Sequence, residues 1–257
     1  MSRAILCSPT CTWFLKTTNN LLSSSFVFLS MPIYTYESPH SLPRLANKFV
    51  IVDTSYLQDL SDPNEENFET ILEFHRQALA NNTTFSLNVV VRQEFIKLVR
   101  KTLLINAIMD LSRTDPVMET RYRTVTGFTS KPFTPENLKN AYEQIYKNHL
   151  KKNDFNLLLD AMKTDIWQEV QMLEDKANIT YVSAPSKGAD TWEALGELVQ
   201  KTGMTPTDAM IVNFAFMIDA DAIVTTDCDY APVEESIDVY MPLSIAQQCG
   251  TYDPSLD

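Results

Sequence analysis

Residues 48–53 read KFVIVD, a short β-branched apolar run that ends on an acid, and this stretch decides the fold. Such a run is typical of a buried strand that ends at the edge of a sheet. Four similar runs follow at residues 83–91, 179–183, 222–226 and 237–242. Continuous apolar strands of this kind are typical of parallel sheets, because helices cover both faces of such sheets.

Segments with helical periodicity lie between the strand candidates. They occupy residues 64–81, 92–113, 135–151, 155–176, 190–202 and 206–220. Alternation of such strands and helices indicates an α/β protein. We therefore expect a three-layer α/β/α sandwich with a central parallel sheet and a helical insertion.

The boundaries of this domain follow from where the strand and helix patterns begin and end. We expect one α/β domain at residues 48–242, interrupted by a helical insertion at about 114–177. The insertion would open with a loop, because residues 114–132 contain turn residues and weak periodicity. Residues 1–47 are expected to form a poorly ordered N-terminal extension, since the first part is acid-free and rich in Ser, Thr and Asn. Residues 243–257 are expected to form a C-terminal tail.

Composition excludes several classes of protein. No apolar segment approaches the roughly 20 residues that a transmembrane helix needs, so we expect no membrane partner. The five glycines lack the spacing of a dinucleotide fingerprint or a P-loop, and the three histidines form no HExxH motif. The four cysteines form no regular framework, which favours unpaired thiols and a cytoplasmic location.

The net charge of −12 argues at first against a nucleic-acid partner. The charges are unevenly distributed, however, because residues 92–163 contain 13 of the 21 Lys and Arg residues and have a net charge of +5. Residues 164–257 have a net charge of −14. This asymmetry suggests that the middle segment contacts a polyanion, with a solvated helical face as the alternative.

Single acids occur where strand candidates end or the following helices begin. Asp53 closes the first run, Glu94 follows the second run, and Asp208 lies in the first turn of an apolar helix. Asp227 directly follows the strand candidate at 222–226, and Asp229 comes two residues later. Ligand sites of open parallel sheets gather at the carboxyl ends of strands, so these acids could converge on one point.

Each acid also has a purely structural interpretation. Residues 205–208 can be read as a capping box with proline at the first helical position, and Asp53 could cap the helix that follows it. Asp227 and Asp229 could be turn residues. If the acids do converge, two carboxylates 4 Å apart repel by roughly 4 kcal/mol at an effective dielectric of 20. A converged cluster therefore needs protons or cations, and Mg²⁺ or Mn²⁺ are the natural ions for oxygen ligands.

Four stretches of the chain together resemble the PIN-domain nucleases. They are VIVDTS at 50–55, VVVRQEF at 89–95, TDAMIVNFAF at 207–216 and IVTTDCDY at 223–230. The last two are the most specific, because an acid, an apolar helix, a strand and a T-x-D motif recur in the family's order. Tyr230 departs from the family, which usually has Phe there.

The resemblance implies a metal-dependent endoribonuclease that hydrolyses RNA phosphodiester bonds with Mg²⁺ or Mn²⁺. The implied catalytic residues and metal ligands are Asp53, Glu94, Asp208 and Asp227, with Asp229 as an accessory ligand. The implied residues that orient these carboxylates are Thr54, Ser55 and Thr225. The long insertion and the N-terminal extension fall outside the resemblance.

The basic middle segment supplies candidate contacts to single-stranded or structured RNA. Four candidates share the helix of Glu94, namely Arg92, Lys97, Arg100 and Lys101. In the expected loop, Arg121 and Arg123 flank Tyr122, on which a base could stack. A protein partner at the helical insertion and a homo-oligomer are both compatible with this sequence.

Three other functions are compatible with parts of this pattern. A haloacid-dehalogenase-like phosphatase needs a second acid two residues after Asp53, where this chain has Ser55. A non-catalytic PIN-like scaffold or binding module would keep the fold without the activity. A toxin-type nuclease would keep both the PIN-like fold and the nuclease activity, and a partner protein would mask that activity.

Overall fold

The chain is seen in a computed structural model that describes residues 33–114, 153–183, 190–233 and 237–250, and separate positions between 116 and 138. Its strands are β1 (Tyr34–Thr35), β2 (Phe49–Val52), β3 (Thr84–Leu87), β4 (Ile179–Tyr181), β5 (Ala222–Val224) and β6 (Asp238–Met241). They form one six-stranded sheet in the order β1-β6-β5-β2-β3-β4, and all neighbouring strands are parallel. The α/β class and the parallel sheet expected from the sequence are confirmed.

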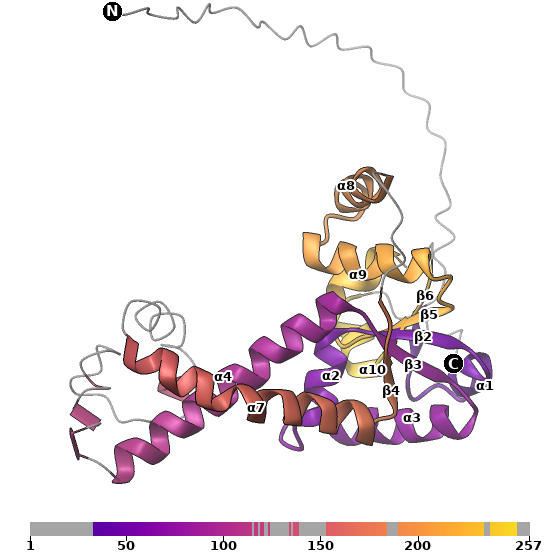
Figure 1. Ribbon diagram of the computed structural model, residues 1–257. Coiled ribbons are helices and arrows are strands. Elements are labelled where there is room, and N and C mark those ends of the chain that lie inside the picture. Colours follow the sequence, from indigo (N-terminus) through magenta and orange to yellow (C-terminus); the bar gives the residue numbers. More distant parts are fainter. Residues whose placement is uncertain are drawn as a thin grey trace, which may run out of the picture.

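The helices surround this sheet on both sides. They are α1 (Ser41–Leu45), α2 (Thr54–Ser61), α3 (Phe68–Ala80), α4 (Val89–Thr114), α7 (Asn153–Lys176), α8 (Asp190–Thr202), α9 (Pro206–Met217) and α10 (Leu243–Gln248), with the 3-10 helix η1 (Cys228–Val233). Helices α8 and α9 lie on one side of the sheet, whereas α2, α3 and α10 lie on the other (Figure 1). This layering is consistent with a three-layer α/β/α fold. None of the helices in the described part of the chain is long and apolar enough to cross a membrane.

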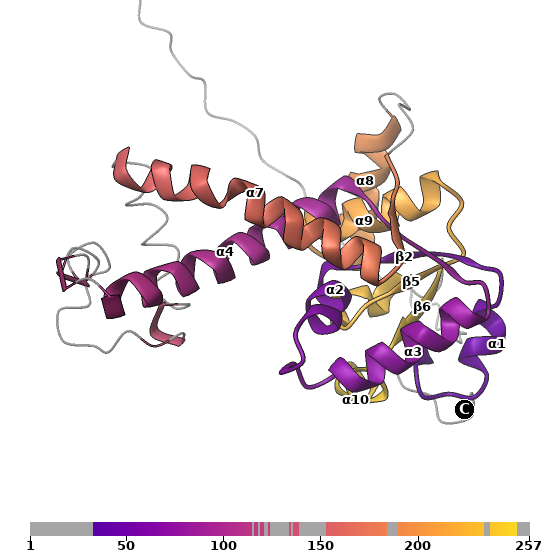
Figure 2. The same cartoon turned by 60° about the horizontal axis from the view of Figure 1, so that its bottom comes forward.

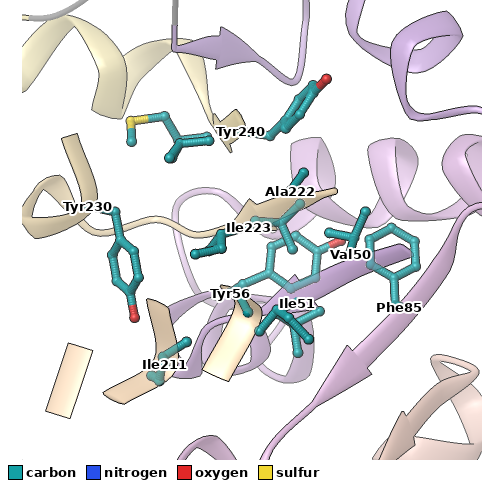
Figure 3. Packing of buried hydrophobic residues seen from close by; sticks show 14 of the residues in the cluster. Val50, Ile51, Tyr56, Phe85, Ile211, Ala222, Ile223, Tyr230 and Tyr240 are labelled. Carbon is teal, nitrogen blue, oxygen red and sulfur yellow. The ribbon is translucent and has the colours of Figure 1, made fainter. Parts of the chain in front are cut away.

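Apolar side chains from the central strands form the core. Val50, Ile51 and Ile223 are fully buried in neighbouring strands. They pack with Tyr56 of α2 and Phe85 of β3, which are also fully buried (Figure 3). Burying one such side chain contributes about 1.5–3 kcal/mol, so this core holds the strand ends in fixed positions.

Strand β3 is shorter than the sequence predicts. The expected strand at 83–91 ends at Leu87, and α4 already begins at Val89. The reason is Asn88, whose side-chain Oδ1 accepts a hydrogen bond from the Val91 N–H at 2.9 Å and so caps the helix. Glu94 therefore lies in the second turn of α4.

Residues 33–47 belong to the folded domain, so the extension predicted at 1–47 is wrong in this part. Strand β1 pairs with β6, and the side chains of Tyr34 and Tyr36 are buried. The Tyr36 hydroxyl donates to the Thr225 carbonyl oxygen at 2.9 Å, which ties this segment to the end of β5. A strand of only two residues has no periodicity that a sequence pattern could reveal. Residues 1–32 lie outside the described residues.

The predicted C-terminal tail also begins inside the domain. Helix α10 occupies Leu243–Gln248, and its Ala246 is fully buried. Directly after it, Cys249 forms a disulfide with Cys228, with a Cα–Cα distance of 5.4 Å. The expectation that all cysteines are unpaired is therefore wrong. Disulfides persist mainly in oxidising compartments, so the cysteines no longer favour a cytoplasmic location.

Helices α4 and α7 form a long pair that projects beyond the sheet (Figures 1 and 2). The last part of α7 returns to the core, where Val170 of this helix and Ala177, directly after it, are buried. The helical insertion predicted at 114–177 therefore extends too far towards the C-terminus. The described positions at 116–123, in the expected loop, are helical, and the helix expected at 135–151 lies mostly outside the described residues.

Candidate functional site

The candidate site lies where the order of the strands changes direction. From β2 the chain continues to β3 and β4 on one side, and then returns past β2 to form β5 and β6 on its other side. Asp53 follows β2 directly, and its backbone N–H donates to the Val224 carbonyl oxygen at 3.0 Å. Asp227 follows β5 three residues after Val224. Crevices at such switch points, outside the carboxyl ends of the strands, are where open α/β sheets bind ligands.

Asp53 is the centre of a buried hydrogen-bond network. The residue is 4% exposed, and its Oδ2 accepts from the Ser55 hydroxyl at 2.6 Å and from the Thr225 hydroxyl at 3.0 Å. Oδ2 also accepts from the Ser55 backbone N–H at 3.3 Å, so Asp53 caps α2 as well. The other oxygen, Oδ1, accepts from the Tyr230 hydroxyl at 3.0 Å.

Two backbone groups fix the hydroxyls of this network. The Thr226 N–H donates to Ser55 Oγ, and the Asp227 N–H donates to Thr225 Oγ1, both at 3.0 Å. Each hydroxyl thus accepts one hydrogen bond from the backbone and donates its proton to Asp53. Ser55 and Thr225 lie where the sequence predicts residues that orient a carboxylate.

In the sequence, Tyr230 is notable only because it stands where PIN nucleases usually have Phe. Its side chain is fully buried, and its hydroxyl reaches Asp53. Burial chiefly raises the pKa of Tyr230 well above its usual value, and the negative charges of Asp53, Asp208 and Asp227 raise this pKa further. Tyr230 therefore remains a protonated donor.

Asp208 lies near the other aspartates at the start of α9. Burial chiefly raises the pKa of Asp208, and the negative charges of Asp53, Asp227 and Asp229 add to this increase. A hydrogen bond from the Thr205 hydroxyl opposes it. Thr205 Oγ1 also accepts from the Asp208 backbone N–H at 3.3 Å, so the capping interpretation holds beside the proximity to the other acids.

Asp227 and Asp229 form a turn at the same edge of the sheet. Asp227 Oδ1 accepts from the Asp229 backbone N–H at 2.9 Å. Both aspartates contribute to the raised pKa of Asp208, which places them within electrostatic reach of that group. The structure thus gathers four of the five predicted acids, Asp53, Asp208, Asp227 and Asp229, around one end of the sheet.

Glu94 lies beside this group and has its own partner. Its Oε2 accepts from the Thr54 hydroxyl at 2.7 Å, and Thr54 is the residue next to Asp53. Thr54 therefore orients Glu94, whereas Ser55 and Thr225 orient Asp53. Glu94 is not among the charges that raise the pKa of Asp208.

A further acid, Asp59, is not predicted from the sequence. It lies inside α2 and not at the end of a strand or near the start of a helix, where the other acids are found. The residue Asp59 is 9% exposed, and burial chiefly raises the pKa of its carboxyl group. Hydrogen bonds from the side chains of Asn67 and Thr226 act in the opposite direction. Asp59 thereby fixes the residue just before Asp227.

The acids have the ligand chemistry of a magnesium or manganese site. Among the described residues, none of the five predicted acids forms an ion pair with Lys or Arg. Within the same part of the chain, no three His, Cys, Asp or Glu side chains are grouped closely enough to hold one metal ion. Mg²⁺ usually binds one or two carboxylates and keeps several waters, so a pair of these acids suits its requirements.

The predicted RNA contacts are only partly accessible. The Arg92 guanidinium forms an ion pair with Glu174, in which Nη2 donates to Oε2 at 2.9 Å. Arg123 pairs in the same way with Glu119, at 2.7 Å. Lys97 is exposed on α4, whereas Arg100 and Lys101 are partly buried and Arg121 and Tyr122 lie outside the described residues.

A groove among the described residues lies away from the acids. It has a volume of about 820 Å³ between α2, α3, α4 and α7, and none of the five predicted acids lines it. His75 at its wall uses both ring nitrogens internally, with Tyr56 and with the Ala177 carbonyl oxygen. This groove therefore does not belong to the acidic site.

Comparison with known proteins adds no identification. No protein-family model matches this chain, and no curated protein has a significantly similar sequence.

Proposed function

We propose that this chain is a metal-dependent endoribonuclease with a PIN-like fold, which hydrolyses RNA phosphodiester bonds at the acidic end of β2 and β5. The observation that carries this proposal is the gathering of Asp53, Asp208, Asp227 and Asp229 without an ion-paired cation among the described residues. Such a group of like charges is unfavourable alone and becomes favourable around a divalent cation.

The residues of the site would have separate roles. Asp208 and Asp227 are the best candidates to hold Mg²⁺ or Mn²⁺, because one protein donor each occupies their carboxylates, the Thr205 hydroxyl and the Asp229 N–H, against four on Asp53. A bound ion of this kind supplies an activated water and stabilises charge on the leaving oxygen. Asp53 would add negative charge to the site in a fixed position, because Ser55, Thr225 and Tyr230 donate hydrogen bonds to it. Glu94, held by Thr54, would flank it on the α4 side.

RNA is the proposed substrate for two reasons. The resemblance to PIN nucleases implies it, and the exposed Lys97 lies on α4, the helix that also carries Glu94. The scarcity of glycine excludes a phosphate-binding loop, so phosphate would be held by cations.

The test is cleavage of a 5′-labelled single-stranded RNA by the full chain with Mn²⁺. Asp227→Asn is the sharpest variant, because an amide oxygen can still accept from the Asp229 N–H and keep the turn. We expect Asp227→Asn and Asp208→Asn to abolish cleavage. Glu73→Gln, an exposed acid paired with Arg76 on α3, should cleave like the wild type. Undiminished cleavage by both site variants would contradict the proposal.

A non-catalytic binding module is the second candidate, and one observation favours it. The Asp53 carboxylate already accepts hydrogen bonds from three side chains, which is a complete structural role. Calorimetric titration with Mn²⁺ separates the two functions. A nuclease should bind the ion and lose this binding in Asp227→Asn, whereas a scaffold should show no heat of binding in either protein.

A further inference from the structure

We infer that Trp167, Arg92 and Tyr181 form a platform on which unpaired bases of single-stranded RNA stack. We call these three residues the aromatic platform. This inference rests on the proposed function, because it assigns the substrate strand a path at the acidic site. It adds that the substrate is single-stranded, which the acids alone do not specify.

The platform is held together from three separate elements. The Arg92 guanidinium carbon of α4 lies 5.4 Å from the ring centroid of Trp167 in α7 and 4.8 Å from that of Tyr181 in β4. Glu174 of α7 fixes the guanidinium through an ion pair in which Nε and Oε1 are 2.8 Å apart. The arginine is thus set against both rings, and its charge is already balanced.

Both rings remain open to solvent despite these contacts. Trp167 is 41% exposed and Tyr181 is 38% exposed, so each keeps a large accessible aromatic surface. Aromatic side chains beside a groove or edge are what single-stranded nucleic-acid binders use, because every base offers a flat face for stacking. A base in a duplex is already stacked on both sides and offers no such face.

The platform lies at the same edge of the sheet as the acids. Tyr181 pairs with Leu87 of β3, while the preceding Ser86 pairs with Ile51 of β2, so the ends of β4 and β2 are nearly level. Two strand spacings separate β4 from β2, which corresponds to about 10 Å. Arg92, which pairs with Glu174 of α7, and Glu94, which accepts from Thr54 beside Asp53, both lie in the first two turns of α4. A strand bound at the acids can therefore continue onto the aromatic platform.

Stacking and charge can be separated by the salt dependence of binding. Counterion release makes affinity fall with salt in proportion to the phosphates contacted, whereas stacking has no such slope. Removing Trp167 should therefore weaken binding without changing the salt slope. Replacing exposed Lys97 with Gln should weaken binding less and flatten the slope. A purely structural role of Trp167 would not give this pattern.

The experiment measures fluorescence anisotropy of a labelled 12-nucleotide RNA, single-stranded or in a duplex, with the full chain in EDTA. EDTA prevents metal-dependent cleavage, so binding is read alone. Trp167→Ala should weaken single-strand binding roughly 5- to 150-fold, as expected for loss of one stacked base. Trp167→Phe should keep most of the affinity, and Phe216→Ala, an exposed aromatic on α9, should bind like the wild type. Tyr181→Ser provides a second variant should Trp167→Ala unfold.

Each outcome has a defined meaning. The platform is refuted by equal affinity for single strand and duplex, by unchanged binding in the variants, or by no RNA binding at all, as expected for a protein-docking surface. Cleavage with Mn²⁺ together with unchanged binding of Trp167→Ala would remove the platform and leave the nuclease intact. Single-strand binding that depends on Trp167, without any cleavage, would support the platform and contradict the proposed nuclease activity.

Discussion

Tyr230→Phe tests whether the buried Asp53 carboxylate needs the hydrogen bond from Tyr230 for the stability of the fold. The Tyr230 hydroxyl is fully buried and donates to Asp53 Oδ1 at 3.0 Å. Among the described residues, Oδ1 has no other hydrogen-bond donor, so the substitution leaves this oxygen unsatisfied in a residue that is 4% exposed.

The expected loss of stability follows from this geometry. A hydrogen bond to a charged group contributes about 1.5–3 kcal/mol. For a domain of this size, 1 kcal/mol corresponds to about 2–4 °C in melting temperature, so Tyr230→Phe should melt about 3–12 °C lower. Tyr240→Phe is the matched control, because Tyr240 is also buried but donates to no carboxylate among the described residues. Its loss should be about 1 kcal/mol or less.

Urea unfolding followed by circular dichroism, without divalent ions, provides the measurement. The midpoint should fall in Tyr230→Phe while the slope stays constant. In the double variant Tyr230→Phe with Asp53→Asn, the two losses of unfolding free energy should not add. Asp53→Asn removes the negative charge that accepts the Tyr230 hydrogen bond. Unchanged stability of Tyr230→Phe, or strictly additive losses, would refute a charged Asp53 bound by Tyr230.

Three further predictions concern the disulfide, the buried histidine and the metal. Reduction of Cys228–Cys249, which are 21 residues apart, should cost about 3 kcal/mol in thermal unfolding, and equal melting with and without reductant would contradict the bond. Burial lowers the pKa of His75 below 6.5, so stability should be full above that pH and fall as the pH drops towards the folded-state pKa. His75→Gln should flatten this pH dependence, and an unchanged profile would contradict the neutral imidazole. Mn²⁺ should raise the melting temperature of the wild type but not of Asp208→Asn, and an equal rise in both would place the ion elsewhere.

The sequence predicts most of the sheet because buried parallel strands leave a clear signal. The runs at β2 and β5 are apolar and end near Asp53 and Asp227, so both the strands and the acids after them could be found. Strand β1 could not, because two residues carry no pattern and their partner β6 lies about 200 residues away. Asn88 is a residue type that commonly caps helices, but the apolar residues 89–91 after it continue the strand pattern, so the sequence predicts a longer strand.

The site is less predictable than the sheet, because its contacts join distant parts of the chain. Ser55 and Thr225 could be anticipated from their place beside the acids, but the donation from Tyr230 to Asp53 depends on how η1 folds back. The sequence predicts that Arg92 contacts RNA, whereas in the structure Arg92 forms an ion pair with Glu174. Only the packing of α7 against α4 reveals that partner.

Anomalous diffraction from a crystal of the full chain soaked in Mn²⁺ tests the central claim most directly. The account predicts an anomalous peak bonded to carboxylate oxygens of at least two of Asp53, Asp208 and Asp227. A saturating soak that leaves no peak at this end of β2 and β5, or places its peak elsewhere in the molecule, would contradict it.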